Sequence, residues 1–366
     1  MPAPTLSAET VLAALRAVVD PDLRKDIVTL GFVKNLQIDD HGVAFTIELT
    51  TPACPVKDRL QEQARAVVAA LGVSQVDVTM TASVRSATAP EHGRPPLPGV
   101  KNVIAVGAGK GGVGKTTVAV NLAVALAKAG SKVGILDGDM YGPNVPIMLG
   151  LQAELQSDGK RIVPAEKYGI QIVSMGFMTT DETPVIWRGP MLHGAVQQFF
   201  RDVGWRDLDY LIVDMPPGTG DVALSLSQTV PVAGAVVVTT PQQVSLADTR
   251  RAVRMYQKLN IPPLGIVENM SYYACTNCQH ESHIFGYGGG EQLAEQLEVP
   301  FLGRLPIYEP IRVGSDRGTP LVIAEPDSIS TRAFTQVAER VAAQVSIAAH
   351  KAATANKGKI PLTPVR

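Results

Sequence analysis

The feature that most constrains this chain is a glycine-rich segment that matches G-x-x-x-x-G-K-[ST], the motif of phosphate-binding loops. The segment consists of Gly109, Lys110, Gly111, Gly112, Val113, Gly114, Lys115, Thr116 and Thr117. An apolar run at residues 103–106 precedes it, and an Ala- and Leu-rich stretch at residues 118–129 follows it and ends at Gly130. Because the motif binds phosphate between a buried strand and a helix, this context predicts a P-loop.

The residue types of this loop indicate its chemistry. Glycines let backbone N–H groups surround a polyphosphate at the positive end of the following helix. Lys115 is expected to reach the β- and γ-phosphates, and the Thr116 hydroxyl is expected to bind Mg²⁺. The guanine motif Asn-Lys-x-Asp is absent, since residues 356–359 read Asn-Lys-Gly-Lys. We therefore expect ATP as the nucleotide.

Composition restricts the remaining classes of function. A length of 366 residues predicts two or three domains, and an apolar content of 45% excludes wholesale disorder. A net charge of −1 gives no electrostatic argument for a nucleic-acid or membrane partner. No run approaches the roughly 18 apolar residues that span a membrane, and Met1-Pro2-Ala3-Pro4 shows no charged region followed by an apolar stretch. These observations favour a cytoplasmic protein.

The chain divides into four predicted segments. Residues 1–85 are expected to form a small α/β domain, with helical stretches at 5–19 and 56–71 and strands at 43–49 and 76–80. Residues 86–99 are rich in proline and are expected to be a linker. Residues 100–345 are assigned to the ATPase domain, and residues 346–366, which lack a large apolar face, to a disordered tail.

Strands and helices alternate through residues 100–345, which predicts a P-loop NTPase fold with a mostly parallel sheet covered by helices on both faces. After the strand that leads into the P-loop, strands are expected at residues 132–136, 170–174, 210–213, 234–239, 264–268 and 300–305. Ligands of such sheets lie at the carboxyl ends of the strands.

Polar side chains follow several of these strands. Asp214 stands where a Walker B carboxylate orients Mg²⁺ or its water. Asp137 and Asp139 are candidates for holding metal-bound water and for positioning the attacking water, and we assign the latter role to Asp139. Helix capping or turn formation is the alternative for each of the three acids.

The three cysteines are Cys54, Cys275 and Cys278. A disulfide framework does not suit a large cytosolic enzyme, so the Cys-x-x-Cys pair indicates metal or redox chemistry. Cys54 precedes Pro55 at the expected start of a helix, where N–H groups lower the pKa of a thiol. A reactive thiolate and a small residue packed at a turn both remain open for Cys54.

The second lysine of the loop, Lys110, supports a more specific interpretation. The form Gly-Lys-Gly-Gly-x-Gly-Lys-Thr-Thr resembles the deviant Walker A motif of the family that includes positional ATPases and the nitrogenase iron protein. This resemblance implies a face-to-face homodimer in which Lys110 reaches the phosphates of the partner.

Further motifs resemble those of the Mrp/ApbC family of iron–sulfur cluster carrier ATPases. They are the runs at residues 137–144, 187–190, 208–221 and 269–271 and the Cys275-x-x-Cys278 pair, so the resemblance covers nearly all of residues 100–345. Residues 1–85 resemble the SufT/MIP-type iron–sulfur assembly domain, through Asp20-Pro21-Asp22 and the Thr51–Pro55 run.

These resemblances imply an ATPase that carries a [4Fe–4S] cluster across a homodimer and transfers it to apoproteins. Apo iron–sulfur proteins and cluster-assembly scaffold proteins would be its partners. The catalytic residues would be Lys110, Lys115, Asp139 and Asp214, and Asn269 would contact adenine. A four-iron cluster usually takes four thiolates, so Cys275 and Cys278 of two chains would complete the set.

There are four alternatives, three for the function and one for the cysteine pair. Cys275, Cys278, His280 and His283 could hold a structural zinc within one chain, and the protein would then be a partner-binding or positional switch. A partition ATPase is disfavoured by the Cys-x-x-Cys pair. An electron-transferring reductase is disfavoured because residues 214–227 contain no cysteine. A thioredoxin-like redox pair is disfavoured because no helix start surrounds the cysteines.

Overall fold

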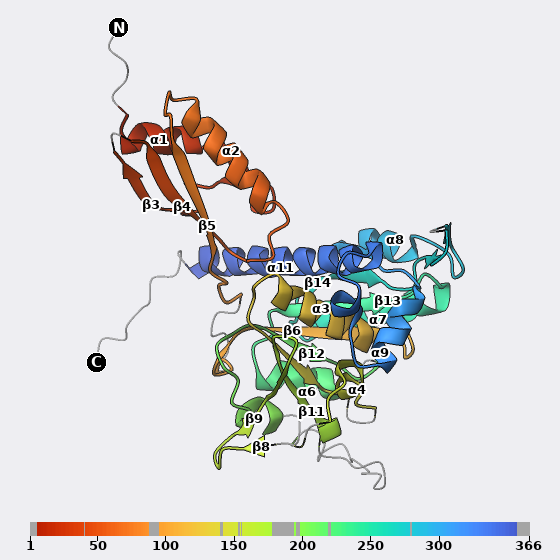
Figure 1. Cartoon of the computed structure of the whole chain (residues 1–366). Helices are drawn as coiled ribbons and strands as arrows, with labels where there is room; N and C mark the ends of the chain where they lie inside the picture. Colours follow the sequence, from red (N-terminus) through yellow and green to blue (C-terminus); the bar gives the residue numbers. More distant parts are fainter. Residues whose placement is uncertain are drawn as a thin grey trace. The chain divides into compact units, whose positions relative to one another are not determined.

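The computed structural model describes residues 6–39, 41–87, 95–139, 142–152, 154, 156–177, 194, 198–218, 221–278 and 280–356. It divides into two compact units, one of residues 1–85 with 353–366 and one of residues 86–352 (Figure 1). The predicted motif at residues 187–190 lies outside the described residues, as do Met140, Tyr141, Thr219 and Gly220.

The first unit contains a three-stranded sheet and two helices. Its elements are α1 (Ala8–Leu15), β1 (Val19–Asp20), β2 (Lys25–Asp26), β3 (Val33–Ile38), β4 (Val43–Leu49), α2 (Lys57–Ala69) and β5 (Val76–Ala82). In the sheet, β4 lies between β3 and β5, antiparallel to the first and parallel to the second. Strand β3 was not predicted, because its alternation is interrupted at Asn35, which has φ 50°, and the register with β4 shifts there.

The core of this unit follows from two periodicities. Every second residue of β4 is buried, and α2 buries Leu60, Ala64 and Val68 at a spacing of four. The strand and the helix therefore each present one apolar face to the same core, which also takes residues from α1.

The second unit begins at Ser86 and is built on one large sheet. Its elements are β6 (Val100–Ala108), α3 (Lys115–Lys128), β7 (Val133–Asp137), α4 (Val145–Leu149), β8 (Gln156–Ser157), β9 (Ile162–Val163), β10 (Ala165–Lys167), β11 (Ile170–Ser174), the 3₁₀ turn η1 (Met175–Phe177), β12 (Leu208–Asp214), α6 (Asp221–Thr229), β13 (Gly234–Thr239), α7 (Gln243–Lys258), β14 (Pro263–Glu268), β15 (Tyr273–Ala274), β16 (Glu281–Ser282), α8 (Gly289–Gln296), β17 (Phe301–Arg304), α9 (Glu309–Asp316), α10 (Leu321–Ala324) and α11 (Ile329–Asn356).

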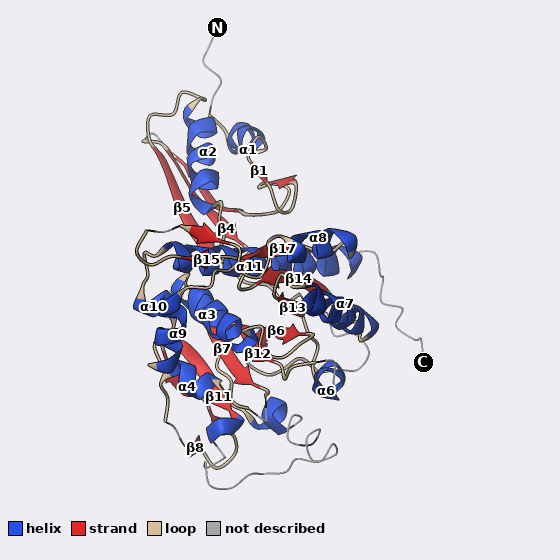
Figure 2. Ribbon diagram, turned by 90° about the vertical axis from the view of Figure 1, so that its right-hand side faces the viewer, coloured by secondary structure: helices blue, strands red, loops and turns tan. Residues whose placement is uncertain are grey.

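The eight strands of the sheet follow the order β10-β11-β7-β12-β6-β13-β14-β17. Strand β10 is antiparallel to its neighbour, and the other pairings are parallel. Figure 2 shows α3, α4, α9 and α10 on one side of the sheet and α6 and α7 on the other. The predicted mostly parallel sheet with helices on both faces is therefore confirmed.

Burial on both faces explains the near-continuous apolar runs of the central strands. Each residue of β7, β12 and β13 is buried. On one face, side chains of α6, α7 and α8 pack against these strands and Trp205. Strand β12 lies between β7 and β6 and is parallel to both. The carboxyl ends of the three strands therefore lie on the same side of the sheet, where the P-loop and the predicted aspartates meet.

Two predicted boundaries differ from the structure. Leu97, which we placed in the linker, is buried in the core of the second unit, and the Ala87 N–H donates to Oδ1 of Asn102 at 2.8 Å. The ends of the predicted linker therefore belong to that unit. Residues 346–356, predicted to be part of a disordered tail, continue α11, since alanine favours helix most strongly and Ala349 is buried. Residues 357–366 lie outside the described part of the chain.

Candidate nucleotide site and cysteine segment

The P-loop connects β6 to α3 through a backbone that requires glycine. Gly112 and Gly114 both have φ 79°. A Cβ on Gly109 would lie 2.3 Å from the Asp248 backbone, and one on Gly114 would lie 2.3 Å from Nδ2 of Asn269. Gly114 is also the N-cap of α3 and supplies no side-chain cap, so the first N–H groups of the helix remain available to an anion.

Lys115, Thr116 and Asp214 form a contiguous polar cluster at the start of α3. Nζ of Lys115 donates to Oδ1 of Asp214 at 2.6 Å, and Oγ1 of Thr116 donates to Oδ2 at 2.7 Å. The Asp214 side chain is fully buried and that of Lys115 is 8% exposed. Burial raises the pKa of Asp214, and the Lys115 charge opposes this rise.

Asp137 lies beside Asp214 at the end of the neighbouring strand. Its Oδ2 accepts from Oγ of Ser174 at 2.9 Å and from the Val145 N–H, and its Oδ1 accepts from the Asp139 N–H. Burial, and secondarily the charge of Asp214, raise the pKa of Asp137 to about 7. Ser174 was not among the predicted site residues. Its position at the end of a predicted parallel strand, where ligands bind, could have identified it.

A cavity of about 220 Å³ opens above these groups. It is lined by Lys110, Gly111, Gly112, Gly114, Lys115, Thr116, Thr117, Asp139, Asn144, Met148 and Pro217. Lys110 is exposed and Asp139 is half-buried. Two lysines, the P-loop backbone and a hydroxyl paired with a carboxylate suit the phosphates and Mg²⁺ of a nucleotide. Asn144, Met148 and Pro217 were not predicted as site residues, although Asn144 and Pro217 lie within quoted motifs.

Asn269 is buried beneath the P-loop. Its Nδ2 donates to the Val113 carbonyl at 2.8 Å, and its exposed fraction is 6%. The structure thus brings Asn269 to the loop that binds phosphate. The adenine contact implied by the resemblance stays a prediction.

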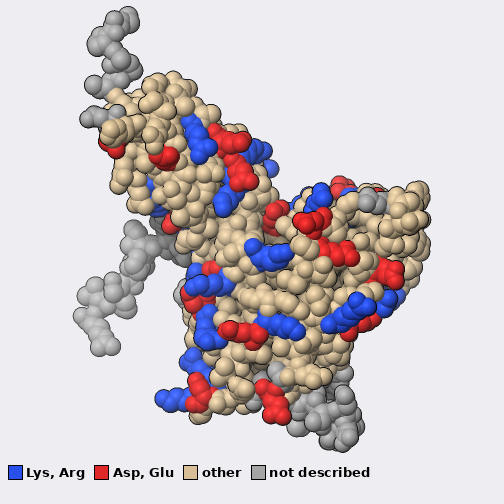
Figure 3. Space-filling model, viewed as in Figure 1, with Lys and Arg blue, Asp and Glu red and all other residues tan. Residues whose placement is uncertain are grey.

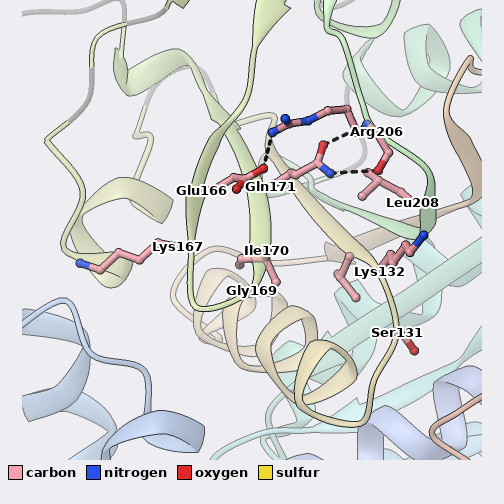
Figure 4. Close-up of a pocket in the computed structure, with 10 residues that line it drawn as sticks. Ser131, Lys132, Glu166, Lys167, Gly169, Ile170, Gln171, Arg206 and Leu208 are labelled. Carbon is pink, nitrogen blue, oxygen red and sulfur yellow. Dashed lines mark hydrogen bonds and ion pairs between the residues drawn. The ribbon is translucent and has the colours of Figure 1, made fainter.

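A second cavity, of about 390 Å³, lies at the amino ends of β7, β11 and β12 (Figure 4). Its charged side chains are engaged by protein groups: Arg206 pairs with Glu166, Lys132 pairs with Asp207, and Nζ of Lys167 donates to the Gly150 carbonyl. Parallel sheets bind ligands at their carboxyl ends, so the smaller cavity is the candidate nucleotide site.

The cysteine pair lies on a short two-stranded ribbon formed by β15 and β16. The Cys275 N–H donates to the His280 carbonyl, which closes the turn that contains both cysteines. Cys275 is half-buried and Cys278 is exposed. The N–H groups of Cys278 and Asn277, followed by the Cys278 thiol, lower the pKa of Cys275. The ribbon therefore presents two adjacent sulfur ligands, and the lowered pKa of Cys275 makes its thiolate form more accessible.

Of the residues considered as zinc ligands, His280 and His283 do not complete a metal site with the cysteine pair in the described part of the chain. Within the described residues, no three His, Cys, Asp or Glu side chains gather closely enough to hold a metal ion. The ring of His283 contacts that of Tyr287, with 4.4 Å between centroids. Cys54 is half-buried, packs against the core of the first unit and precedes α2.

On the face shown in Figure 3, acidic and basic side chains are interspersed. Among the residues that the structure describes, no helix is both long and apolar enough to cross a membrane.

A glycine-rich loop between a buried parallel strand and a helix, with its lysine and threonine on a strand-end aspartate, defines a P-loop NTPase. A family model described as NUBPL iron-transfer P-loop NTPase matches residues 99–342, and one described as iron-sulfur cluster assembly protein matches residues 8–81. The chain belongs to the iron–sulfur cluster carrier family of P-loop NTPases, which confirms the resemblance to the Mrp/ApbC family.

Curated relatives match along most of the chain. The iron–sulfur cluster carrier protein of Synechocystis sp. is 48% identical over 352 residues, which cover 94% of this chain and 99% of the relative. The protein of the same name from Escherichia coli strain K12 is 43% identical over 345 residues, covering 91% and 93%.

Solved structures share the fold of the second unit. A nucleotide-binding protein of Archaeoglobus fulgidus, solved with ADP, is 36% identical with a TM-score of 0.56 and covers 63% of this chain and 91% of its own. The septum site-determining protein MinD of Pyrococcus horikoshii, solved with Mg-ADP, is 26% identical with a TM-score of 0.50, covering 66% and 95%.

Proposed function

We propose that this protein is an ATP-hydrolysing carrier that holds a [4Fe–4S] cluster across a homodimer and transfers it to apo iron–sulfur proteins. The observation that carries the proposal is the ribbon of β15 and β16 in the second unit, which presents Cys275 and Cys278 at an accessible turn. Membership of the carrier family supports the same cargo.

The number of thiols supports cluster bridging between two chains. A four-iron cluster usually takes four thiolates, and each ribbon provides two. The N–H groups of Asn277 and Cys278 favour the thiolate form of Cys275, which is the form that binds iron. Two ribbons related by a two-fold axis would complete the ligand set. Exposure of Cys278 suits a cargo that must leave.

The nucleotide site would use the cluster of Lys115, Thr116 and Asp214. Mg²⁺ bound with ATP would neutralise phosphate charge at Thr116 and Asp214. Lys115 lines the same cavity and would exchange its contact with Asp214 for one with the phosphates. Asp139, half-buried at the cavity, would orient the attacking water. Lys110 is exposed at the same cavity, which suits its proposed role at the partner's phosphates. Hydrolysis would be slow and would time the change in dimer geometry.

Anaerobic reconstitution with measurement of iron, sulfide and zinc tests this function. The double variant Cys275→Ser/Cys278→Ser removes the proposed ligands, and Cys54→Ser is the matched control in the other unit. The proposal predicts about four irons and four sulfides per dimer, retained in the control, lost in the double variant and transferable to an apoprotein. One tight zinc per monomer without cluster uptake would contradict it and favour the structural-zinc alternative.

A further inference from the structure

Glu268, the last residue of β14, is a buried carboxylate that the nucleotide chemistry does not use. Its exposed fraction is 0%. A buried carboxylate is costly unless donors surround it, and this one is surrounded. It accepts from Oγ of Ser271 at 2.5 Å, from the Gly288 N–H at 3.1 Å and from the Gly290 N–H.

The donors belong to the two ends of one excursion of the chain. The chain leaves the sheet after Glu268, forms the ribbon with Cys275 and Cys278, and returns at Gly288 to begin α8. Gly288 has φ 76° and is the N-cap of α8, so the carboxylate receives the N–H groups at the positive end of that helix. Glu268 therefore closes the base of the segment that carries both cysteines, and α8 packs beside β14 and β17 (Figure 2).

Arg304 attaches the same segment from the other side. Its guanidinium lies 4.5 Å from the ring centroid of Tyr287, within the returning part of the excursion, and it pairs with Glu291 of α8. Its Nε lies 4.0 Å from Oε1 of Glu268. The charge of Arg304 thus compensates that of the buried carboxylate, and its side chain spans Glu268 and the cysteine segment.

The residue next to Glu268 binds the P-loop. Nδ2 of Asn269 donates to the Val113 carbonyl at 2.8 Å. The backbone between the two side chains is fixed by the sheet, because the Asn269 N–H donates to the Thr239 carbonyl and the Leu305 N–H donates to the Glu268 carbonyl. The contact with the P-loop and the buried carboxylate therefore belong to adjacent residues, joined by one peptide unit that the sheet holds.

We propose that Glu268 is a positioning residue that couples the nucleotide loop to the segment carrying Cys275 and Cys278. This inference rests on the proposed function, since it takes the P-loop as the nucleotide site and the cysteine pair as the cargo site. Asn269 contacts the P-loop at the Val113 carbonyl, and the Glu268 carboxylate holds the N–H groups of Gly288 and Gly290. Nucleotide binding thereby changes the accessibility of the two thiols without contacting them.

The test measures the rate at which iodoacetamide alkylates the cysteine pair, with and without ATP and Mg²⁺, in cluster-free full-length protein. Cys54→Ser serves as the background, so that the reacting thiols are Cys275 and Cys278. Nucleotide affinity is measured on the same samples. Glu268→Gln keeps the shape of the side chain but replaces the carboxylate, which accepts from two backbone N–H groups, with a neutral amide. Glu295→Gln, the same change at an exposed position of α8, is the matched control.

A second variant reaches the same contact from the cysteine side. A Cβ on Gly290 would lie 3.0 Å from both Cβ and Oε2 of Glu268, so Gly290→Ala displaces the carboxylate while leaving the P-loop sequence intact. If Glu268→Gln does not fold, the alkylation rates of Gly290→Ala test the coupling instead.

Nucleotide should change the alkylation rate about fivefold or more in the background protein and in Glu295→Gln. In Glu268→Gln and Gly290→Ala, nucleotide should still bind but the two rates should become equal. A merely structural role of Glu268 would alter both rates together and leave their ratio unchanged, which would overturn the proposal. Equal rates in a background protein that binds nucleotide would overturn it as well. Failure of the background protein to bind nucleotide would overturn the proposed function and this coupling with it.

Discussion

Nζ of Lys115 lies 2.6 Å from Oδ1 of Asp214, and neither side chain is more than 8% exposed. Each charge compensates the cost of burying the other, so removing either side chain would leave an uncompensated buried charge and destabilise the fold. The same two residues are the ones proposed to bind phosphate and Mg²⁺. The strand-end aspartate therefore positions the lysine that is proposed to bind phosphate.

Replacing Lys115 by methionine is expected to destabilise the nucleotide-free second unit by about 3 kcal/mol, because Asp214 would remain buried without its partner. Nucleotide affinity should also fall by more than tenfold. The free energy of unfolding can be followed by fluorescence, since both tryptophans of the chain, Trp187 and Trp205, fall within residues 86–352.

The matched control is Lys101→Met. Lys101 also contacts an aspartate, Asp209, at 2.8 Å, but its side chain is 40% exposed. A partly exposed pair contributes less than about 1 kcal/mol. Equal losses of stability in the two variants would contradict the account of Lys115 and Asp214.

Gly114→Ala is expected to abolish tight nucleotide binding. A Cβ there would lie 2.3 Å from Nδ2 of Asn269, which would separate Asn269 from the Val113 carbonyl and reshape the P-loop. Gly159→Ala is the control, because Gly159 also has a positive φ, of 87°, but no atom lies within 4 Å of the added Cβ. It should cost about 1–2 kcal/mol of backbone strain and leave nucleotide affinity unchanged. Retained affinity in Gly114→Ala would show that the close contact is dispensable.

Asp137 should make the nucleotide-free protein less stable as the pH rises. Burial raises its folded-state pKa to about 7, above the value of 3.8 for an exposed aspartate, so the folded state holds a proton that the unfolded state has lost. The stabilising effect of that proton is complete below the unfolded pKa and is lost as the pH rises through about 7. The slope between these values is at most about 1.4 kcal/mol per pH unit.

Urea unfolding of wild type and Asp137→Asn between pH 5 and pH 8.5 measures this effect. The asparagine variant cannot lose the proton, so its stability relative to wild type should increase with pH. A constant offset between the two proteins across this range would mean that Asp137 does not titrate there.

Cys275 should react as a thiolate at lower pH than an ordinary cysteine. The N–H groups of Cys278 and Asn277 lower its pKa, and a serine at position 278 retains the first of these groups. In Cys54→Ser/Cys278→Ser, the pH midpoint of alkylation should therefore fall below the value of about 8.5 typical of a free thiol. N-acetylcysteine is the reference, and a midpoint equal to its own would contradict the proposed stabilisation of the thiolate.

The sequence predicted the parallel strands of the sheet and the P-loop cluster because both depend on local patterns, whereas the antiparallel edge strand β10 was not predicted. Strands β11 and β13 begin and end at the predicted residues. Strand β13 shows the reason most clearly, since it is fully buried and such parallel strands appear as continuous apolar runs. Asp137 and Asp214 were recognisable because they follow such runs, and parallel neighbours bring their ends together.

The contacts of Glu268 and Asn269 could not be predicted in this way. Asn269 binds Val113, which is 156 residues away in sequence, and Glu268 binds Gly288 across 20 residues. Both contacts depend on the packing of β14 between β13 and β17, which no local pattern encodes. The end of α11 was placed too early for a different reason, because an alanine-rich helix with few large apolar residues resembles a tail.

Anaerobic native mass spectrometry of the reconstituted protein tests the central claim most directly, because it counts chains and cluster in one species. If two chains share the cluster, a dimer with one four-iron cluster should appear, and only monomers without a cluster should appear when Cys275 and Cys278 are both replaced by serine. A monomer that carries a complete cluster, or one zinc per monomer with no cluster-bearing dimer, would contradict the account.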